Sequence, residues 1–171
     1  TSHIAGLKNI TKKIIIGTAL FEGIGAIILS LRFVGEFGIT KGIWYGVFHS
    51  ISAFCNAGFD LMGVKTPYSS LTYFVDNPMI NITVMSLIII GGIGFLTWED
   101  IGTHKLKFKR YRMQSKVIIA TTALLILIPS LYFFFFEFGT GNFEERIWSS
   151  LFQAVTPRTA AEPRRIADFP R

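Results

Sequence analysis

The chain of 171 residues is 50% hydrophobic and only 16% charged, which is too apolar for an ordinary soluble domain, where about a quarter of the residues are charged. Its formal net charge of +6 would suit a nucleic-acid-binding protein, but the basic residues cluster beside long apolar runs, as in the cytoplasmic loops of membrane proteins. The single cysteine, Cys55, excludes an internal disulfide and an all-cysteine metal site. We therefore expect an all-α membrane protein that binds no nucleic acid.

Residues 12–34 form the first predicted membrane span. Lys8, Lys12 and Lys13 lie at the start of this apolar run and Glu36 follows it, so the positive-inside rule places the amino end in the cytoplasm. The run is longer than the apolar core of a secretory signal, and no small-residue cleavage site follows it. Because the chain also lacks an initiator Met, we expect it to be an internal piece of a longer protein.

A re-entrant pore loop is predicted between residues 42 and 60. This segment, GIWYGVFHSISAFCNAGFD, begins with an amphipathic stretch too short to cross a bilayer and contains a turn at residues 56–58. Irregular backbone is tolerated at membrane depth only where protein or a water-filled path surrounds it, and carbonyl groups bared there can replace the hydration shell of an ion. The helix predicted over residues 42–54 would direct the partial negative charge of its carboxyl end at the same place. The segment therefore predicts a cation pathway.

Cys55, Asn56, Ala57 and Gly58 are the predicted ion-filter residues, because their backbone carbonyls follow this helix directly. Gly58 can adopt backbone angles, and allow a close approach, that a side chain would prevent. Asp60 could concentrate cations at the outer mouth. Two plainer interpretations stay open: Gly58 ends an amphipathic helix that lies on the surface, and Asp60 is a solvated loop carboxylate.

Residues 77–98 form the second predicted span, which opens at a proline and returns the chain to the cytoplasm. Gly91, Gly92 and Gly94 near its end are expected to allow close helix packing rather than to form a hinge. Residues 99–116 are predicted as a cytoplasmic loop, whose basic residues are Lys105, Lys107, Lys109, Arg110, Arg112 and Lys116.

The third predicted span, residues 117–136, repeats the pattern of the first. Each is followed by the tripeptide Glu-Phe-Gly and then by a short helix with a tryptophan near its start, Trp44 in the first case and Trp148 in the second. This shared order is typical of duplicated units in transport proteins. We therefore divide the chain into a complete span, pore loop and span unit at 12–98, the basic loop at 99–116, the first half of the next unit at 117–160 and an atypical polar tail at 161–171.

Glu22 lies inside the first span, where a charge is costly unless it is paired or wetted. A hydrogen bond to a neighbouring helix and a role in the ion path both stay open for it. His49 and His104 have no partners at metal-ligand spacing. No metal site is therefore expected beyond that of the transported cation.

These segments resemble the Trk/Ktr/HKT superfamily of potassium transporters, and most closely the membrane subunits of the bacterial Ktr system. The resemblance rests on the unit at residues 12–98, on SISAFCNAGFD as a filter loop and on LFQAVTPRTA as the start of the next one. In this family four such units surround one pore, and each gives a filter strand with a central glycine. The resemblance implies that Gly58 is the filter glycine of this unit, and that Thr159 and Ala160 belong to a second filter strand.

Ala161 stands where the family has its glycine, and the tail after it lacks the returning span. We therefore expect one unit and half of another, which is inactive by itself because half of the pore wall would be missing. The resemblance further implies a multi-pass protein of the bacterial plasma membrane, a homodimer of the intact subunit surrounded by lipid, and a cytosolic nucleotide-binding regulatory ring that contacts the basic loop. It implies potassium as the transported ion and allows sodium as a coupling or activating ion; no cofactor is expected.

No nucleophile with a base, paired carboxylate site or phosphate-cradling loop is visible, so an enzyme is not expected. The predicted function is uptake of potassium down its electrochemical gradient through a carbonyl-lined filter. Two alternatives stay open. One is a membrane scaffold or assembly subunit, which would tolerate bulk at Gly58, and the other is a proton-coupled carrier that uses Glu22.

Overall fold

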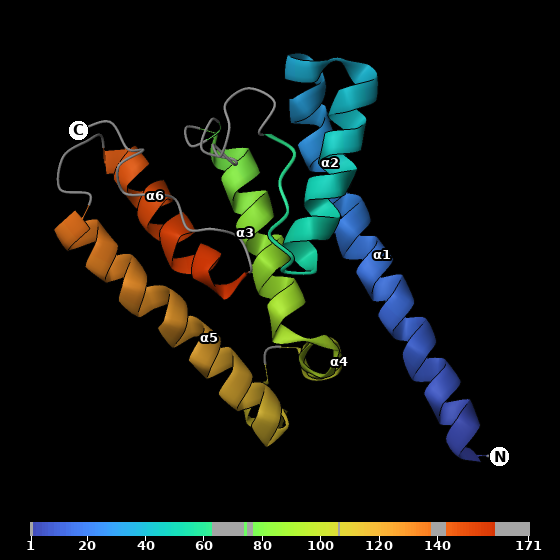
Figure 1. Ribbon diagram of the computed structural model, residues 1–171. Coiled ribbons are helices and arrows are strands. Elements are labelled where there is room, and N and C mark those ends of the chain that lie inside the picture. The colour runs from blue at the N-terminus through green and yellow to red at the C-terminus, as the bar shows by residue number, and fades with distance from the viewer. Residues whose placement is uncertain (1, 63–73, 75–76, 106, 138–142, 160–171) are drawn as a thin grey trace.

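In a computed structural model of the chain, residues 2–62, 74, 77–105, 107–137 and 143–159 are described, and every regular element among them is a helix (Figure 1). Two segments are long and apolar enough to cross a membrane, Lys8–Phe37 and Met113–Phe136, and a bent helix pair passes the same test as a third. The prediction of an all-α membrane protein is therefore confirmed.

Helix α1 (Ser2–Phe37) and helix α2 (Ile39–Phe54) form an antiparallel hairpin joined by one residue, Gly38 (Figure 1). The φ angle of Gly38 is +79°, in the region that favours glycine. α2 begins three residues before the helix predicted at 42–54 and ends where that prediction ends. The hairpin thus returns the chain along α1 and leaves residue 55 beside the middle of that helix.

A stripe of small residues on α2 brings the two helices together. A Cβ atom at Gly42 or Gly46 would overlap the backbone of α1, and small residues at this spacing are the usual way for membrane helices to approach closely. The stripe continues one turn later at Ser50, whose hydroxyl donates to the backbone carbonyl of Glu22 at 2.7 Å. The spacing Gly-x-x-x-Gly-x-x-x-Ser was the sequence signal for this contact.

The second predicted span is divided at Gly94 into α3 (Pro78–Ile93) and α4 (Phe95–His104), which meet at 96°. Gly94 has φ +78° and open space around its Cα, so it makes the bend, and the expectation of close packing there rather than a hinge is wrong. At Gly91 the expectation of close packing is confirmed, because a Cβ atom there would overlap the Phe54 carbonyl at the carboxyl end of α2. The 16 residues of α3 extend about 24 Å at about 1.5 Å per residue, which is less than the ~30 Å hydrocarbon layer.

Trp98 stabilises this bend. Its indole N–H donates at 2.8 Å to the carbonyl of Ile90, an oxygen near the carboxyl end of α3 that a continuing helix would have bonded. The indole also packs against Phe21 of α1 and Phe54 of α2, with ring centroids 5.2 and 5.5 Å apart. One side chain therefore joins the bend to both α1 and α2.

The second half of the chain repeats the order of a long helix and a short one. After the 3₁₀ turn η3 (Phe108–Arg110), α5 (Met113–Tyr132) continues into the π-helical turn η4 (Phe133–Glu137), and α6 (Phe143–Val155) ends in the 3₁₀ turn η5 (Thr156–Arg158). Figure 1 shows α6 between α5 and α3. The packed core lies where α1, α2, α3 and α6 meet, and it includes Leu29, Phe33, Ile80, Leu87, Phe152 and Val155.

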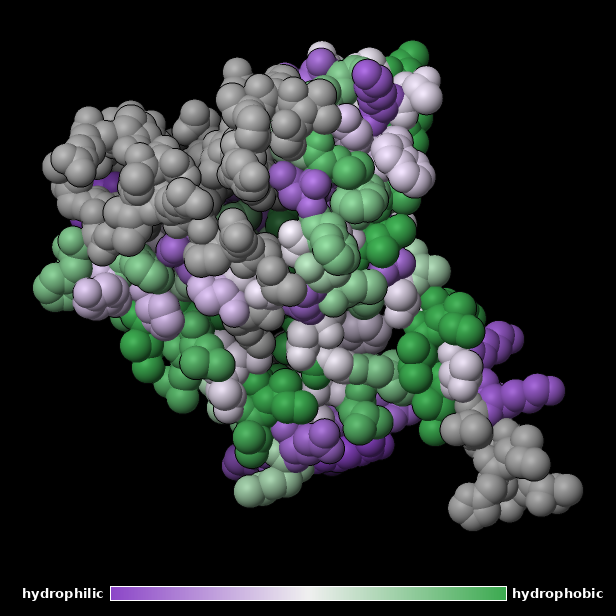
Figure 2. Space-filling view, in the orientation of Figure 1, coloured by the Kyte–Doolittle hydropathy of each residue, from purple (hydrophilic) through white to green (hydrophobic). Residues whose placement is uncertain are grey.

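Large apolar side chains remain exposed along α1 and α5, the two helices that are each long and apolar enough to cross a membrane. Figure 2 shows apolar surface along α1 and α5, and polar side chains gathered at one end, over α4 and the first coloured turns of α1. An apolar band of this kind along long helices is the pattern of a surface that faces lipid or another membrane segment. The exposed residues include Ile15, Ile16, Leu20, Ile27 and Leu31 of α1 and Leu124, Leu125, Leu127 and Ile128 of α5.

Candidate ion filter

The filter turn, residues 55–58, follows the last turn of α2 directly. Cys55 caps the helix, and Asn56 has a left-handed φ of +54°. The N–H of Asn56 donates to the Ala53 carbonyl at 3.1 Å, and the N–H of Ala57 donates to the Ser52 carbonyl at 2.9 Å. These two bonds form a Schellman motif, in which one residue in the left-handed region closes the carboxyl end of a helix. The motif fixes where the filter turn begins.

Gly58 makes the second reversal in this turn, with a φ of +72°. Within the described residues, no N–H or O–H donates to the carbonyl oxygens of the filter turn. The carbonyl oxygens just before the turn do accept hydrogen bonds; that of Phe54 accepts one from the side-chain amide of Asn56 at 3.3 Å. Carbonyl groups at the carboxyl end of a helix carry partial negative charge, and no basic residue lies in the last turn of α2 to offset it. The turn therefore offers oxygen ligands suited to a cation.

The exit limb, residues 59–62, is held to α2 by side chains. The hydroxyl of Ser52 donates to the carbonyl of Phe59 at 2.8 Å. The carboxylate of Asp60 lies 3.0 Å from Nε2 of His49 and also accepts the N–H of Met62 at 2.9 Å. The Asp60 side chain is 21% exposed, so this carboxylate is bound to a buried ring as well as open to solvent.

Glu22 lies beside the start of the filter turn. The thiol of Cys55 donates to Oε1 of Glu22 at 3.8 Å, and the Glu22 side chain is half-buried. The structure therefore places this carboxylate against the turn that follows α2, and both interpretations of Glu22, a structural hydrogen bond and a role in the ion path, stay open. No group of three or more His, Cys, Asp or Glu residues in the described part of the chain could hold a metal ion.

The predicted second filter strand is described only at its first residue. Thr159 follows η5, and both its N–H and its hydroxyl contact the Thr156 carbonyl at 2.9 Å. Thr156 in turn donates to the Phe152 carbonyl at 2.7 Å. Ala160 and the tail at 161–171 lie outside the described residues.

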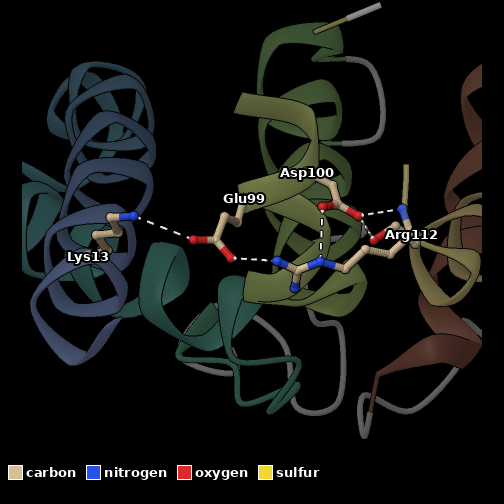
Figure 3. Close-up of polar contacts among 5 residues, drawn as sticks. Lys13, Glu99, Asp100 and Arg112 are labelled. Carbon is tan, nitrogen blue, oxygen red and sulfur yellow. Dashed lines mark hydrogen bonds and ion pairs between the residues drawn. The ribbon is translucent and has the colours of Figure 1, made fainter. Parts of the chain in front are cut away.

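A polar network around α4 was not visible in the sequence (Figure 3). Lys13 of α1 pairs with Glu99 of α4 at 3.4 Å, and Glu99 also pairs with Arg112 at 3.3 Å. The neighbouring Asp100 is 2% exposed and accepts the Ser115 hydroxyl at 2.6 Å and the Arg112 N–H at 3.0 Å. The Ser115 hydroxyl, with Arg112 beside it, lowers the pKa of the Asp100 carboxyl. These contacts tie α4 to the start of α5.

Comparison with known proteins matches residues 2–161 to the TrkH family, described as cation transport protein. The chain is 41% identical over 146 residues to the potassium/sodium uptake protein NtpJ of Enterococcus hirae, covering 82% of this chain and 31% of that protein. It is 35% identical over 163 residues to the Ktr system potassium uptake protein B of Bacillus subtilis, covering 92% of this chain and 35% of that protein. The chain thus spans about a third of the length of the curated relatives it matches.

Proposed function

Because this chain belongs to the TrkH family of cation transport proteins, we propose that it forms part of the wall of a cation pore in the membrane. In this proposal the carbonyl oxygens of Cys55, Asn56, Ala57 and Gly58 bind the transported ion in place of its water shell. The observation that carries the proposal is that these four oxygens accept no hydrogen bond within the described residues and follow a helix carboxyl end directly.

The electrostatics of the site support a monovalent cation. Neutral carbonyl dipoles bind such an ion without holding it too tightly to leave. The α2 helix dipole adds a partial negative charge at the filter turn, and Asp60 adds a carboxylate at its exit. The resulting passage is transport down an electrochemical gradient, with no covalent chemistry and no cofactor.

Potassium is the proposed substrate, with sodium as a second ion of the same pathway. The support is that two relatives are named a potassium/sodium uptake protein and a potassium uptake protein. The preference between potassium and sodium would depend on where the filter strands of all units place their carbonyl oxygens.

We propose that residues 12–98 are one pore unit and that residues 117–160 begin the next, with Thr159 and Ala160 in its filter strand. The long and short helices α1–α2 and α5–α6 support this division. The chain spans about a third of its relatives, so we propose that the remaining units complete the pore and that the 171 residues alone do not transport.

The partners proposed from the family resemblance are a second copy of the intact subunit, membrane lipid and a cytosolic nucleotide-binding ring. The basic segment at residues 99–116 supports a cytoplasmic position for α4 and for the amino end of α1. In this orientation the bacterial plasma membrane surrounds the apolar band of α1 and α5.

The test compares two forms of the protein in a bacterial strain that lacks potassium uptake. The first is the 171-residue chain, and the second is an uptake chimera in which residues 1–159 replace the matching segment of Enterococcus hirae NtpJ. We expect potassium-dependent growth and rubidium uptake from the chimera only. Transport by the chain alone would contradict the need for further units, and loss of transport in the chimera, at normal membrane levels, would contradict its place in the pore.

A further inference from the structure

His49 is a buried ionisable side chain close to the filter turn, and the proposed function assigns it no role. It lies on α2 with 3% of its surface exposed. The rings of Phe33, Tyr45 and Phe48 surround it, with centroid distances of 5.7, 6.4 and 5.7 Å. This aromatic packing fixes the plane of the imidazole and leaves both ring nitrogens free to make polar contacts in different directions.

The two ring nitrogens of His49 contact different parts of the pore loop. Nδ1 lies 2.7 Å from the carbonyl oxygen of Tyr45, one turn earlier in α2, and Nε2 lies 3.0 Å from Oδ1 of Asp60, beyond the filter turn. Carbonyl and carboxylate oxygens only accept, so both contacts are made in full when both nitrogens carry a proton. The N–H of Leu61 also points at Nε2, but at 3.4 Å it is the longer and weaker contact.

Asp60 extends this contact into the exit limb. The same Oδ1 atom that faces His49 accepts the N–H of Met62 at 2.9 Å. Ser52, one turn along α2 from His49, binds the Phe59 carbonyl at 2.8 Å. The filter turn is therefore held at both ends: the Schellman motif fixes its first residues to α2, and the His49–Asp60 and Ser52–Phe59 contacts fix the limb that leaves it.

We propose that His49 is a positioning residue for ion selectivity, which sets the spacing of the filter carbonyls by holding Asp60 against the pore helix. This inference rests on the proposed function, because it matters only if the filter turn binds the ion. A bond from a buried, packed side chain restricts motion of the backbone that it holds, and selectivity depends on the placement and field strength of the carbonyls.

Two carboxamide variants of His49 separate positioning from packing. The amide nitrogen of His49→Gln reaches the place of Nε2 and can still donate to Asp60, whereas that of His49→Asn reaches only the place of Nδ1. In the uptake chimera, we measure half-saturation for rubidium and inhibition by sodium. We expect His49→Asn to lower the rubidium-over-sodium preference by about fivefold or more, the effect of losing one buried hydrogen bond, and His49→Gln to retain most of it. His104→Asn and His104→Gln, at the last residue of α4, are the matched controls.

A second pair of variants covers the case in which His49→Asn does not reach the membrane. Asp60→Asn keeps an oxygen that accepts from His49 and Met62, whereas Asp60→Ala removes it. Both variants remove the carboxylate charge, so the preference should fall further in Asp60→Ala than in Asp60→Asn. Equal preference in the members of either pair would overturn the inference. Gly58→Ser, measured alongside, distinguishes failure of the His49 inference from failure of the proposed filter. If Gly58→Ser loses selectivity while His49→Asn keeps it, only the role of His49 is wrong. If Gly58→Ser also keeps selectivity, the filter proposal itself is wrong.

Discussion

A Cβ atom on Gly91 of α3 would overlap the backbone carbonyl oxygen of Phe54, the last residue of α2. Helix α3 therefore touches α2 at the residue just before the filter turn. Since the neighbouring atom is backbone and not the end of a flexible side chain, α2 and α3 would have to move apart to admit a methyl group.

Gly91→Ala is expected to destabilise the protein by about 1–3 kcal/mol, the usual cost of forcing a group into a packed interface. The measurement is thermal unfolding of the detergent-solubilised uptake chimera. Gly23→Ala, at a site in α1 with open space around it, is the control and should leave the midpoint unchanged or slightly raised, because Ala favours the helix. Equal midpoints for the two variants would contradict the contact.

The bend between α3 and α4 gives a second prediction. Gly94 has φ +78° and ψ 159°, a region that is essentially restricted to glycine, so Gly94→Ala should cost about 1–3 kcal/mol although nothing crowds the site. Gly102→Ala is the control: it adds the same methyl group at an equally open site in α4, where the backbone is helical and alanine causes no strain. If both variants unfold at the same temperature, the bend is not a fixed feature of the native state.

A third prediction concerns the pH dependence of stability at Asp100. Its pKa is lowered below the ordinary value of 3.8, chiefly by the Ser115 hydroxyl, so its contribution to stability is present above that value and is lost as the pH falls through the folded-state pKa. Asp100→Asn should therefore lower the unfolding midpoint at neutral pH, and the difference from the parent should shrink below about pH 4. Glu99→Gln is the control, because its partners Lys13 and Arg112 are largely exposed and such pairs contribute little. A difference that grows in acid would contradict the assignment.

The spans and the pore helix were predictable because apolar periodicity and length are local properties. Residues 42–54 were predicted as a helix and α2 runs Ile39–Phe54; the turn after it was marked by Gly58. The bend at Gly94 was not predicted, because a glycine in an apolar run is compatible with both close packing and a break, and only the fold decides which backbone angles it adopts.

The contacts that hold the filter turn depend on residues that only folding brings together. His49 and Asp60 are separated by eleven residues. The sequence indicated no metal partner for His49, and it left Asp60 as either an outer-mouth charge or a solvated loop carboxylate. Glu22 and Cys55 lie 33 residues apart and meet only because α2 returns along α1. The family resemblance supplied the filter assignment, whereas the side chains that support the filter came from the three-dimensional arrangement.

Whether the backbone at Gly58 forms the ion filter is tested by the ion preference of Gly58→Ser in the uptake chimera. A side chain at φ +72° is strained by about 1–3 kcal/mol, and the strain would be relieved by moving the carbonyls. We predict that rubidium uptake is lost, or that its preference over sodium falls by roughly tenfold or more, since tenfold corresponds to about 1.4 kcal/mol. Gly35→Ser, at an open site in α1, should transport as the parent does. Unchanged preference in Gly58→Ser would contradict the filter and favour a scaffold, and loss of transport in Glu22→Gln alone would favour a carrier.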